Sequence, residues 1–441
     1  MGHVHVHPSE EAPASPQARR MLLVLLAPLI IATVAGLVVL WPSEVRPDLS
    51  AEFGAPDDLV DAQVVGLQRG PCPGTPDEAD IRCVTPTVEI LGGADRGRTV
   101  TLQPQSRAAG VDFDIDERVV LGYTAAAEED FQYYFADRER RGPLLVLGIL
   151  FAVAVIGLGR FHGFRALLGV GISLLALTTF VLPAVLEGSN PLAVALVGSS
   201  FIAFVSLYLA HGLNARTTTA LLGSLGSLAL VGVLSTIFVA ASRFSGLADE
   251  EALFLSISAV DLDLTGLLLG GIVIGTLGVL YDVTVTQASA VWELQRANPR
   301  YTRWELYRSA IRIGRDHIAA TVNTLVLAYA GASLPLFLIF TQADIGLLDA
   351  VNGELVAVEI VRTLCGSIGL VASVPLTTGL AALVVRGPEP PSTEGEDPVD
   401  GDEPPDEAEA VPAAKEAAAT TPTADNDPRH FRSRGERSFW G

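Results

Sequence analysis

The chain has 441 residues, of which 49% are hydrophobic and only 18% are charged, and its mean hydropathy is +0.42. Soluble proteins carry about 25% charged residues, so this composition argues against a soluble globular enzyme. The formal net charge of −21 argues against a nucleic-acid partner, because nucleic acids bind basic surfaces. We therefore expect a polytopic α-helical membrane protein.

Residues 1–20 form a short polar N-terminal tail that ends in two arginines. His3, His5 and His7 alternate within it, and they are either a weak metal site or an incidental feature of the tail. Residues 21–41 are uncharged and long enough to cross the hydrocarbon core of a bilayer. A cleaved signal peptide has an apolar region of only about 7–15 residues, so 21–41 is interpreted as an uncleaved transmembrane anchor.

Segment 42–142 changes to short runs in which apolar and polar residues alternate, a pattern typical of half-buried strands. The four runs are 61–68, 84–91, 98–103 and 117–123. The segment contains 20 acids against 10 arginines, which fits a surface that faces water. The sequence therefore predicts a small β domain, built as a barrel or a curled sheet.

Two of the three cysteines, Cys72 and Cys83, lie in this β segment. A disulfide between them is favoured in an exported domain, and two free thiols are the alternative. A zinc site is less favoured, because no histidine or further cysteine lies nearby.

From residue 143 onward, apolar runs close to the length of about 20 residues needed to cross a bilayer recur with short breaks. We place spans over 143–160, 165–186, 191–211, 217–241, 264–283, 317–341 and 358–385. These seven form a membrane bundle over 143–386. Together with 21–41 they predict about eight transmembrane helices, with the small extracytoplasmic β domain inserted after the first.

Arginines gather at alternate ends of these spans. They are Arg19, Arg20, Arg160, Arg165, Arg216, Arg386 and a cluster of six between 296 and 315. The opposite loops, 187–190, 242–263 and 342–357, contain only Arg243. The positive-inside rule therefore predicts a protein of the plasma (inner) membrane with both termini in the cytoplasm and the β domain outside.

The C-terminal segment 387–441 carries 14 acids against 5 basic residues. Most of the segment is rich in Pro, Glu, Asp, Ala and Thr. Such a composition cannot bury enough apolar surface to offset the loss of chain entropy on folding. We expect a disordered acidic cytoplasmic tail, with a solvated linker favoured over an interaction segment.

Three passages carry a resemblance to a known family. They are GTLGVLYDVTVTQASAVWEL (275–294), NTLVLAYAGASLPLFLIF (323–340) and EIVRTLCGSIGLVASVPLTTGLAALV (359–384). In order and spacing, the chain resembles the YibE/F-like family of multi-pass membrane proteins over residues 42–386. This resemblance implies a permease-like membrane protein without a settled substrate.

An acidic face on the span that begins at 264 is the first candidate site. Asp282, Thr286, Ser289 and Glu293 follow one another at helical spacing and share one face. Ionisable groups at membrane depth normally face a bundle interior or a watery cavity, and on this interpretation the face is a cation or proton site. Alternatively, the helix leaves the membrane near 283 and these groups meet the cytoplasm.

Glu359 and Arg362, three residues apart on the last span, are the second candidate. At this spacing they can neutralise each other on a helix. They are interpreted either as a structural pair near the interface or as a gate.

Helix breakers are the third candidate. Gly331 and Pro335 interrupt the seventh of the eight spans, and Pro375 interrupts the last. Such breaks expose backbone dipoles to a solute in transporters, although single prolines are common in spanning helices. Asn323 could add a polar side chain to the same cavity.

The sequence contains no nucleophile elbow, phosphate-binding glycine loop or HExxH motif, so we expect neither an enzyme nor a cofactor. We expect a transporter or permease of a small solute or ion, embedded in the lipid bilayer, with a homo-oligomer as an open alternative. The rival interpretation is a membrane scaffold or receptor whose β domain binds a partner.

Overall fold

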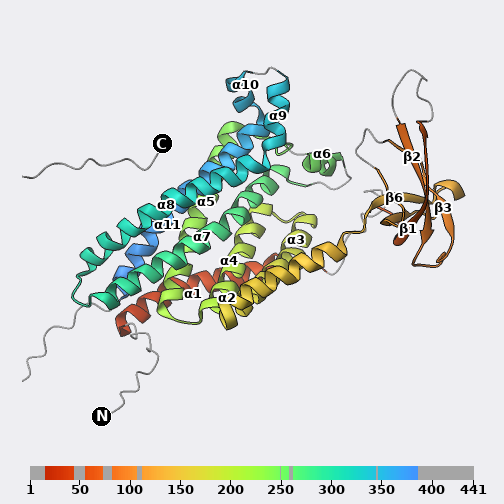
Figure 1. The fold of residues 1–441 in the computed structure, drawn as a ribbon. Helices are drawn as coiled ribbons and strands as arrows, with labels where there is room; N and C mark the ends of the chain where they lie inside the picture. The colour runs from red at the N-terminus through yellow and green to blue at the C-terminus, as the bar shows by residue number, and fades with distance from the viewer. Residues whose placement is uncertain are drawn as a thin grey trace, which may run out of the picture. The chain divides into compact units, whose positions relative to one another are not determined.

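The computed structural model of the protein describes residues 15–43, 55–72, 82–106, 112–248, 250–257, 262–343 and 346–385. Within these residues helices predominate, and one antiparallel sheet follows the first helix (Figure 1). The three N-terminal histidines and the predicted acidic tail over 387–441 lie outside the described residues.

Among the described residues the sheet has six strands. They are β1 (Asp58–Pro71), β2 (Arg82–Ile90), β3 (Thr99–Thr101), β4 (Gln105–Ser106), β5 (Arg118–Tyr123) and β6 (Tyr133–Arg138). The order is β3-β2-β1-β5-β6, with β4 also paired to β2 and every pair antiparallel. Each of the four predicted runs contains a strand, whereas β4 and β6 were not predicted.

The core of the sheet lies on one face, because alternate residues of a strand point the same way. Ala62, Val64 and Val88 are fully buried, and Val64 lies opposite Val88 in the β1–β2 pair. Phe113 is also buried and makes an edge-to-face contact with Phe135, with ring centroids 5.0 Å apart. The apolar positions of the alternating pattern therefore form the core.

A disulfide joins β1 to β2 at one end of the sheet. Cys72 follows β1 directly, Cys83 lies in β2, and their Cα atoms are 4.8 Å apart. Gly70 is the register partner of Cys83, so the bridge lies beside the last paired residues of the two strands. Cys365, in the helical part, is buried and free.

The helical part begins with α1 and continues after the sheet. Its helices are α1 (Pro16–Val39), α2 (Arg141–Ala176), the π-turn η3 (Leu177–Val181), α3 (Leu182–Leu186), α4 (Pro191–His211), α5 (Ala215–Ser242), α6 (Glu250–Ile257), α7 (Leu264–Ala297), α8 (Arg303–Ala332), α9 (Leu334–Gln342), α10 (Leu347–Asn352) and α11 (Glu354–Val384). Six helical segments of the described chain are long and apolar enough to cross a membrane, and α8 with α9 makes a seventh if counted as one span. The protein is therefore a helical membrane protein by composition and length of its helices.

The segment that contains α2 reverses direction at Arg160, whose φ of 49° and ψ of −128° are not helical. An added Cβ at Gly163 would collide with the carbonyl oxygen of Val155, so the chain folds back on itself there (Figure 1). The two spans predicted over 143–160 and 165–186 meet at this reversal.

Two helices extend past the spans predicted from hydropathy. α7 continues to Ala297 rather than stopping near 283, and α8 begins at Arg303 rather than near 317. The predicted spans end where polar residues begin. A helix makes its backbone hydrogen bonds within itself, however, so it can continue through polar residues. Asp282 therefore lies well inside a continuous helix.

The predicted helix breaks have different outcomes. α8 and α9 meet at Ser333 with a bend of 58°, two residues after Gly331. Pro335 lies in the first turn of α9, where its missing N–H leaves no helical hydrogen bond unmade. The predicted break at Pro375 is wrong, since α11 continues through it, as membrane helices do where neighbouring groups satisfy the freed carbonyl.

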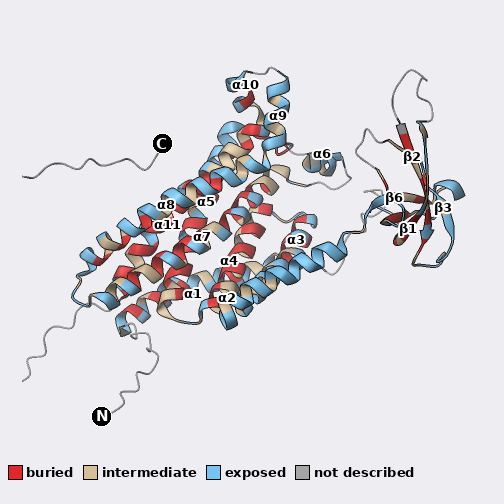
Figure 2. Cartoon of the chain, in the orientation of Figure 1, coloured by how far each residue is buried: buried red, intermediate tan, exposed pale blue. Residues whose placement is uncertain are grey.

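Small residues let α5, α7 and α11 pack closely, as in other membrane bundles. An added Cβ at Gly223 of α5 would collide with the side chain of Thr377 of α11. Ser224 and Thr284 hydrogen-bond at 2.6 Å between α5 and α7. Buried residues gather on the facing sides of these helices, whereas α2 is exposed along most of its length (Figure 2).

Candidate functional site

A glutamate–arginine pair lies near the start of α11, within the helical bundle. Nη1 of Arg362 donates to Oε1 of Glu359 over 2.6 Å. Only 24% of the arginine side chain and 20% of the glutamate side chain are exposed. The spacing of three residues brings them together on one helix face, as the sequence predicted. In apolar surroundings this pairing lowers the cost of both charges.

A cavity of about 250 Å³ lies between the α8–α9 bend and α11. Its polar lining side chains are Tyr329, Ser333, Glu359 and Thr363, and the other lining residues are apolar. Glu359 is thus the acidic group of this first cavity.

A second cavity of about 300 Å³ lies among η3, α3, α4, α7 and the residues Gly246, Ala248 and Ala252. Arg362 reaches it from α11 and is the one charged side chain among its lining residues. Because Glu359 lines the first cavity and Arg362 the second, the ion pair belongs to the walls of both.

Tyr329 of α8 contributes a phenol to the lining of the first cavity. An added Cβ at Gly275 of α7 would lie 3.5 Å from the hydroxyl oxygen of Tyr329, so the missing side chain leaves room for it. Tyr329 and Glu359 line the same cavity. Tyr329 was not predicted as a site residue. Its position in an otherwise apolar stretch, two residues before Gly331, could have indicated a polar group near the helix break.

The predicted acidic face of α7 points away from these cavities. Asp282, Thr286 and Glu293 are exposed, and Ser289 is half-buried. The Thr286 hydroxyl donates to the backbone carbonyl of Asp282 at 2.8 Å, and Glu293 pairs with Arg296 at 3.2 Å. These residues share one helix face, as predicted.

Asn323 of α8 is also exposed. Neither Asn323 nor Asp282 lines the first or the second cavity. The structure therefore brings Glu359, Arg362 and the break at Ser333 together, and it leaves Asn323 and Asp282 outside that group.

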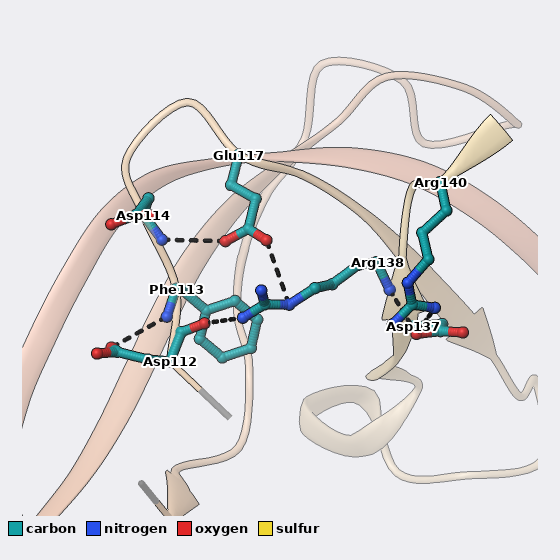
Figure 3. Close-up of polar contacts among 7 residues, drawn as sticks. All are labelled: Asp112, Phe113, Asp114, Glu117, Asp137, Arg138 and Arg140. Carbon is teal, nitrogen blue, oxygen red and sulfur yellow. Dashed lines mark hydrogen bonds and ion pairs between the residues drawn. The ribbon is translucent and has the colours of Figure 1, made fainter. Parts of the chain in front are cut away.

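A separate group of charges surrounds Arg138 of β6 on the sheet (Figure 3). Nε of Arg138 pairs with Glu117 at 3.3 Å, and its Nη2 donates to the carbonyl oxygen of Asp112. Glu117 also accepts from the backbone N–H of Asp114 at 3.0 Å. These contacts hold the segment 112–117 against β6.

Asp137, beside this group, is an exposed carboxylate with two donors. It accepts from the backbone N–H of Arg138 at 2.8 Å and from the Arg140 guanidinium at 2.7 Å. These hydrogen bonds lower the pKa of the Asp137 carboxyl. A general acid or base needs a pKa near the working pH, so this shift indicates a structural role.

Tyr133 of β6 has the largest pKa shift on the sheet. Its hydroxyl donates to a carboxylate oxygen of Asp95 at 2.6 Å. Burial, followed by the hydrogen bond and charge of Asp95, raises the pKa of Tyr133 to about 12. The phenol therefore stays protonated and fastens the turn after β2 to β6.

Within the described part of the chain, no group of three or more His, Cys, Asp or Glu side chains lies close enough to hold a metal ion. His3, His5 and His7, the tail histidines considered above, lie outside that part.

Comparison with protein families identifies the helical part. The profile described as YibE/F-like protein matches residues 147–387, more than half of the chain. The chain belongs to the YibE/F-like family. The match includes Glu359 and Arg362 but starts within α2, whereas the resemblance in the sequence was placed from residue 42. No curated protein and no solved structure matches the chain.

Proposed function

We propose that this YibE/F-like protein is a transporter or permease of the plasma membrane, and that its solute path passes the Glu359–Arg362 pair. The observation that carries the proposal is the position of the pair, because its two residues line different cavities. Charged residues inside a membrane bundle are costly and usually mark a solute or ion pathway.

The proposed topology has eight spans with both termini in the cytoplasm. The reversal at Arg160 supports two spans in the α2 segment, and the bent α8–α9 pair supports one more. Reporter fusions after residue 20, after Arg216 and at the C-terminus are expected to report cytoplasm, and one within 55–72 the exterior. An exported C-terminus would contradict the even number of spans.

In the proposed path, a solute in the first cavity meets Glu359 and a solute in the second meets Arg362. A bound ion that replaces one partner weakens the hydrogen bond between them and separates the two residues that line the different cavities. Ser333, where α8 bends into α9, lines the first cavity, so tilting of α9 would change the width of that cavity.

Uptake into proteoliposomes, measured across a panel of inorganic and small organic ions, tests this proposal. Glu359→Gln keeps the shape of the side chain and removes its charge. We expect initial uptake rates at least about tenfold lower, because one charged contact with the solute is lost. The matched control is Glu293→Gln, which also breaks an i,i+3 pair with an arginine, but on an exposed surface. Similar rates for both variants would contradict the proposal.

The acidic face of α7 remains a second proposed path, and Asp282→Asn tests it. A fall in uptake of about tenfold would place a charge–ion contact on that face. A fall no larger than that of Glu293→Gln would show a solvated surface. No uptake of any ion, together with a partner that binds the β domain, would favour the scaffold or receptor alternative.

A further inference from the structure

The second cavity has an unusual lining for a site that contains a charge. It lies at the starts of α4 and α7, against α3, Gly246, Ala248 and Ala252. Fifteen of its sixteen lining residues are glycine, alanine, proline, valine, leucine or isoleucine, and Arg362 is the sixteenth. The cavity therefore offers an apolar surface with one cationic group in its wall.

Arg362 has hydrogen-bond donors that Glu359 does not use. Nη1 is occupied by Glu359, but Nε is buried and has no hydrogen-bond partner among the described residues. A guanidinium carries five N–H donors, and a buried donor without a partner is unfavourable. Phosphate and carboxylate groups match the planar arrangement of these donors.

These two observations point to different parts of one ligand. An inorganic ion would satisfy the guanidinium, but in this cavity it would lose its hydration against aliphatic side chains without replacement. A neutral hydrocarbon would fill the cavity and leave the donor unpaired. A molecule with an aliphatic chain and one anionic head group satisfies both.

We propose that the second cavity binds an amphipathic anion, whose chain contacts the aliphatic lining and whose phosphate or carboxylate head group contacts Arg362. This inference deepens the proposed function and rests on its ion-pair site, because it names the class of solute. The head group shares the guanidinium with Glu359, so binding weakens the hydrogen bond between Arg362 and Glu359. A phospholipid and a free fatty acid or alkyl phosphate have the same chemistry at this site.

Gly271 provides a variant that fills the cavity and leaves the ion pair untouched. It lines the cavity, and an added Cβ there meets no atom within 4 Å, so a side chain can be attached at this position without a clash at its first carbon. Gly278 is the matched control. It lies on the same exposed side of α7, an added Cβ there also meets nothing within 4 Å, and it does not line the cavity.

The experiment measures binding of radiolabelled dodecyl phosphate to the full-length protein in phosphatidylcholine nanodiscs. We expect saturable binding that is weakened at least about tenfold by Gly271→Leu and less than about twofold by Gly278→Leu. Binding to Gly271→Leu with the affinity of the unsubstituted protein would overturn the proposal.

Competitors test the two halves of the ligand. Dodecyltrimethylammonium has the same chain with a cationic head, and inorganic phosphate has a head without a chain. We expect neither to displace the probe at concentrations where dodecanoate does. Displacement by the cation as readily as by dodecanoate would overturn the role of Arg362, and displacement by equimolar inorganic phosphate would overturn the role of the lining.

A double variant, Glu359→Gln with Arg362→Gln, removes the cation without leaving an unpaired buried acid. We expect binding of dodecyl phosphate at least about tenfold weaker, with folding checked by gel filtration. Should this variant fail to fold, the result from Gly271→Leu and Gly278→Leu still decides the proposal. Preferential displacement by phosphatidic acid would identify a membrane lipid, and by dodecanoate a free amphipathic acid, and either supports the shared chemistry.

Binding and transport can fail separately in these measurements. Binding with the expected pattern but without uptake would leave this inference standing and contradict the proposed transport. Uptake of a small ion that Gly271→Leu leaves unchanged, without binding of dodecyl phosphate, would overturn this inference and leave the proposed transport in place.

Discussion

The sheet and the helical bundle distribute apolar and polar side chains in opposite ways. In the sheet, Val64 and Val88 are fully buried, and charged side chains cover the outside. In the bundle, Leu147 and Phe161 of α2 expose 63% and 68% of their surface, whereas Ser224 and Thr377 are fully buried. This distribution fits a sheet that is surrounded by water and a bundle that is surrounded by lipid.

Because of this difference, an ion pair contributes differently to stability in the two regions. Arg69 and Asp112 on the sheet lie 3.7 Å apart with 56% and 44% of their side chains exposed. Water solvates both charges, and such a pair adds little to stability. Arg362 and Glu359 have less water around them and depend on each other, so their loss has larger consequences.

The largest expected effect comes from removing one charge of the Glu359–Arg362 pair. Arg362→Gln removes the cation that pairs with the partly buried Glu359 carboxylate, and we expect a loss of about 3 kcal/mol in the free energy of unfolding. The measurement is the thermal unfolding temperature of the protein in detergent. Arg69→Gln, the same change on the sheet, is expected to cost less than about 1 kcal/mol. Equal shifts would show that the two pairs are equally solvated.

The disulfide should affect the sheet alone. Replacing Cys72 and Cys83 by serine removes the bridge between β1 and β2, and we expect the sheet to lose about 2–3 kcal/mol of stability. Limited proteolysis checks this, with faster cleavage expected in the sheet and unchanged protection of α4 to α7. Faster cleavage of the helices as well would mean that the two regions unfold together.

Close packing in the bundle is tested by two glycines of α5. Gly223→Val would force a side chain against Thr377, and overpacking of this kind costs about 1–3 kcal/mol. Gly226→Val places the same side chain where an added Cβ meets nothing within 4 Å, so its effect is expected to be smaller. The unfolding temperatures of the two variants are the measurement. The reverse order would contradict the α5–α11 contact.

Local patterns in the sequence predicted what depends on neighbours along the chain. Alternation located strands near 61–68 and 84–91, and helical spacing brought Glu359 to Arg362. A short stretch of chain decides each of these features, so a short stretch of sequence is sufficient to predict it.

Features that depend on packing between distant segments could not be predicted in this way. The second cavity combines residues from η3 to α11, and nothing near Arg362 in the sequence indicates that it lines this cavity. The place of Tyr329 depends on Gly275, a residue of another helix. One of the two interpretations of Asp282 placed it inside the bundle because it is acidic, but the side of a helix that faces inward is set by its neighbours.

The smallest expected effect concerns the buried phenol of the sheet, and its pH dependence appears only in alkali. The pKa of Tyr133 is raised from 10.0 to about 12 in the folded protein. The stability that its hydroxyl contributes is therefore fully present below pH 10 and is lost as the pH rises toward 12. Tyr133→Phe removes both the titration and the hydrogen bond to Asp95, so we expect a loss of about 1 kcal/mol at neutral pH. The unfolding transition of the sheet, followed between pH 8 and pH 12, should fall less steeply in Tyr133→Phe than in the unsubstituted protein. Parallel curves for the two proteins would mean that the phenol is solvated, and that the contrast between a dry sheet core and a polar bundle core is weaker than the structure indicates.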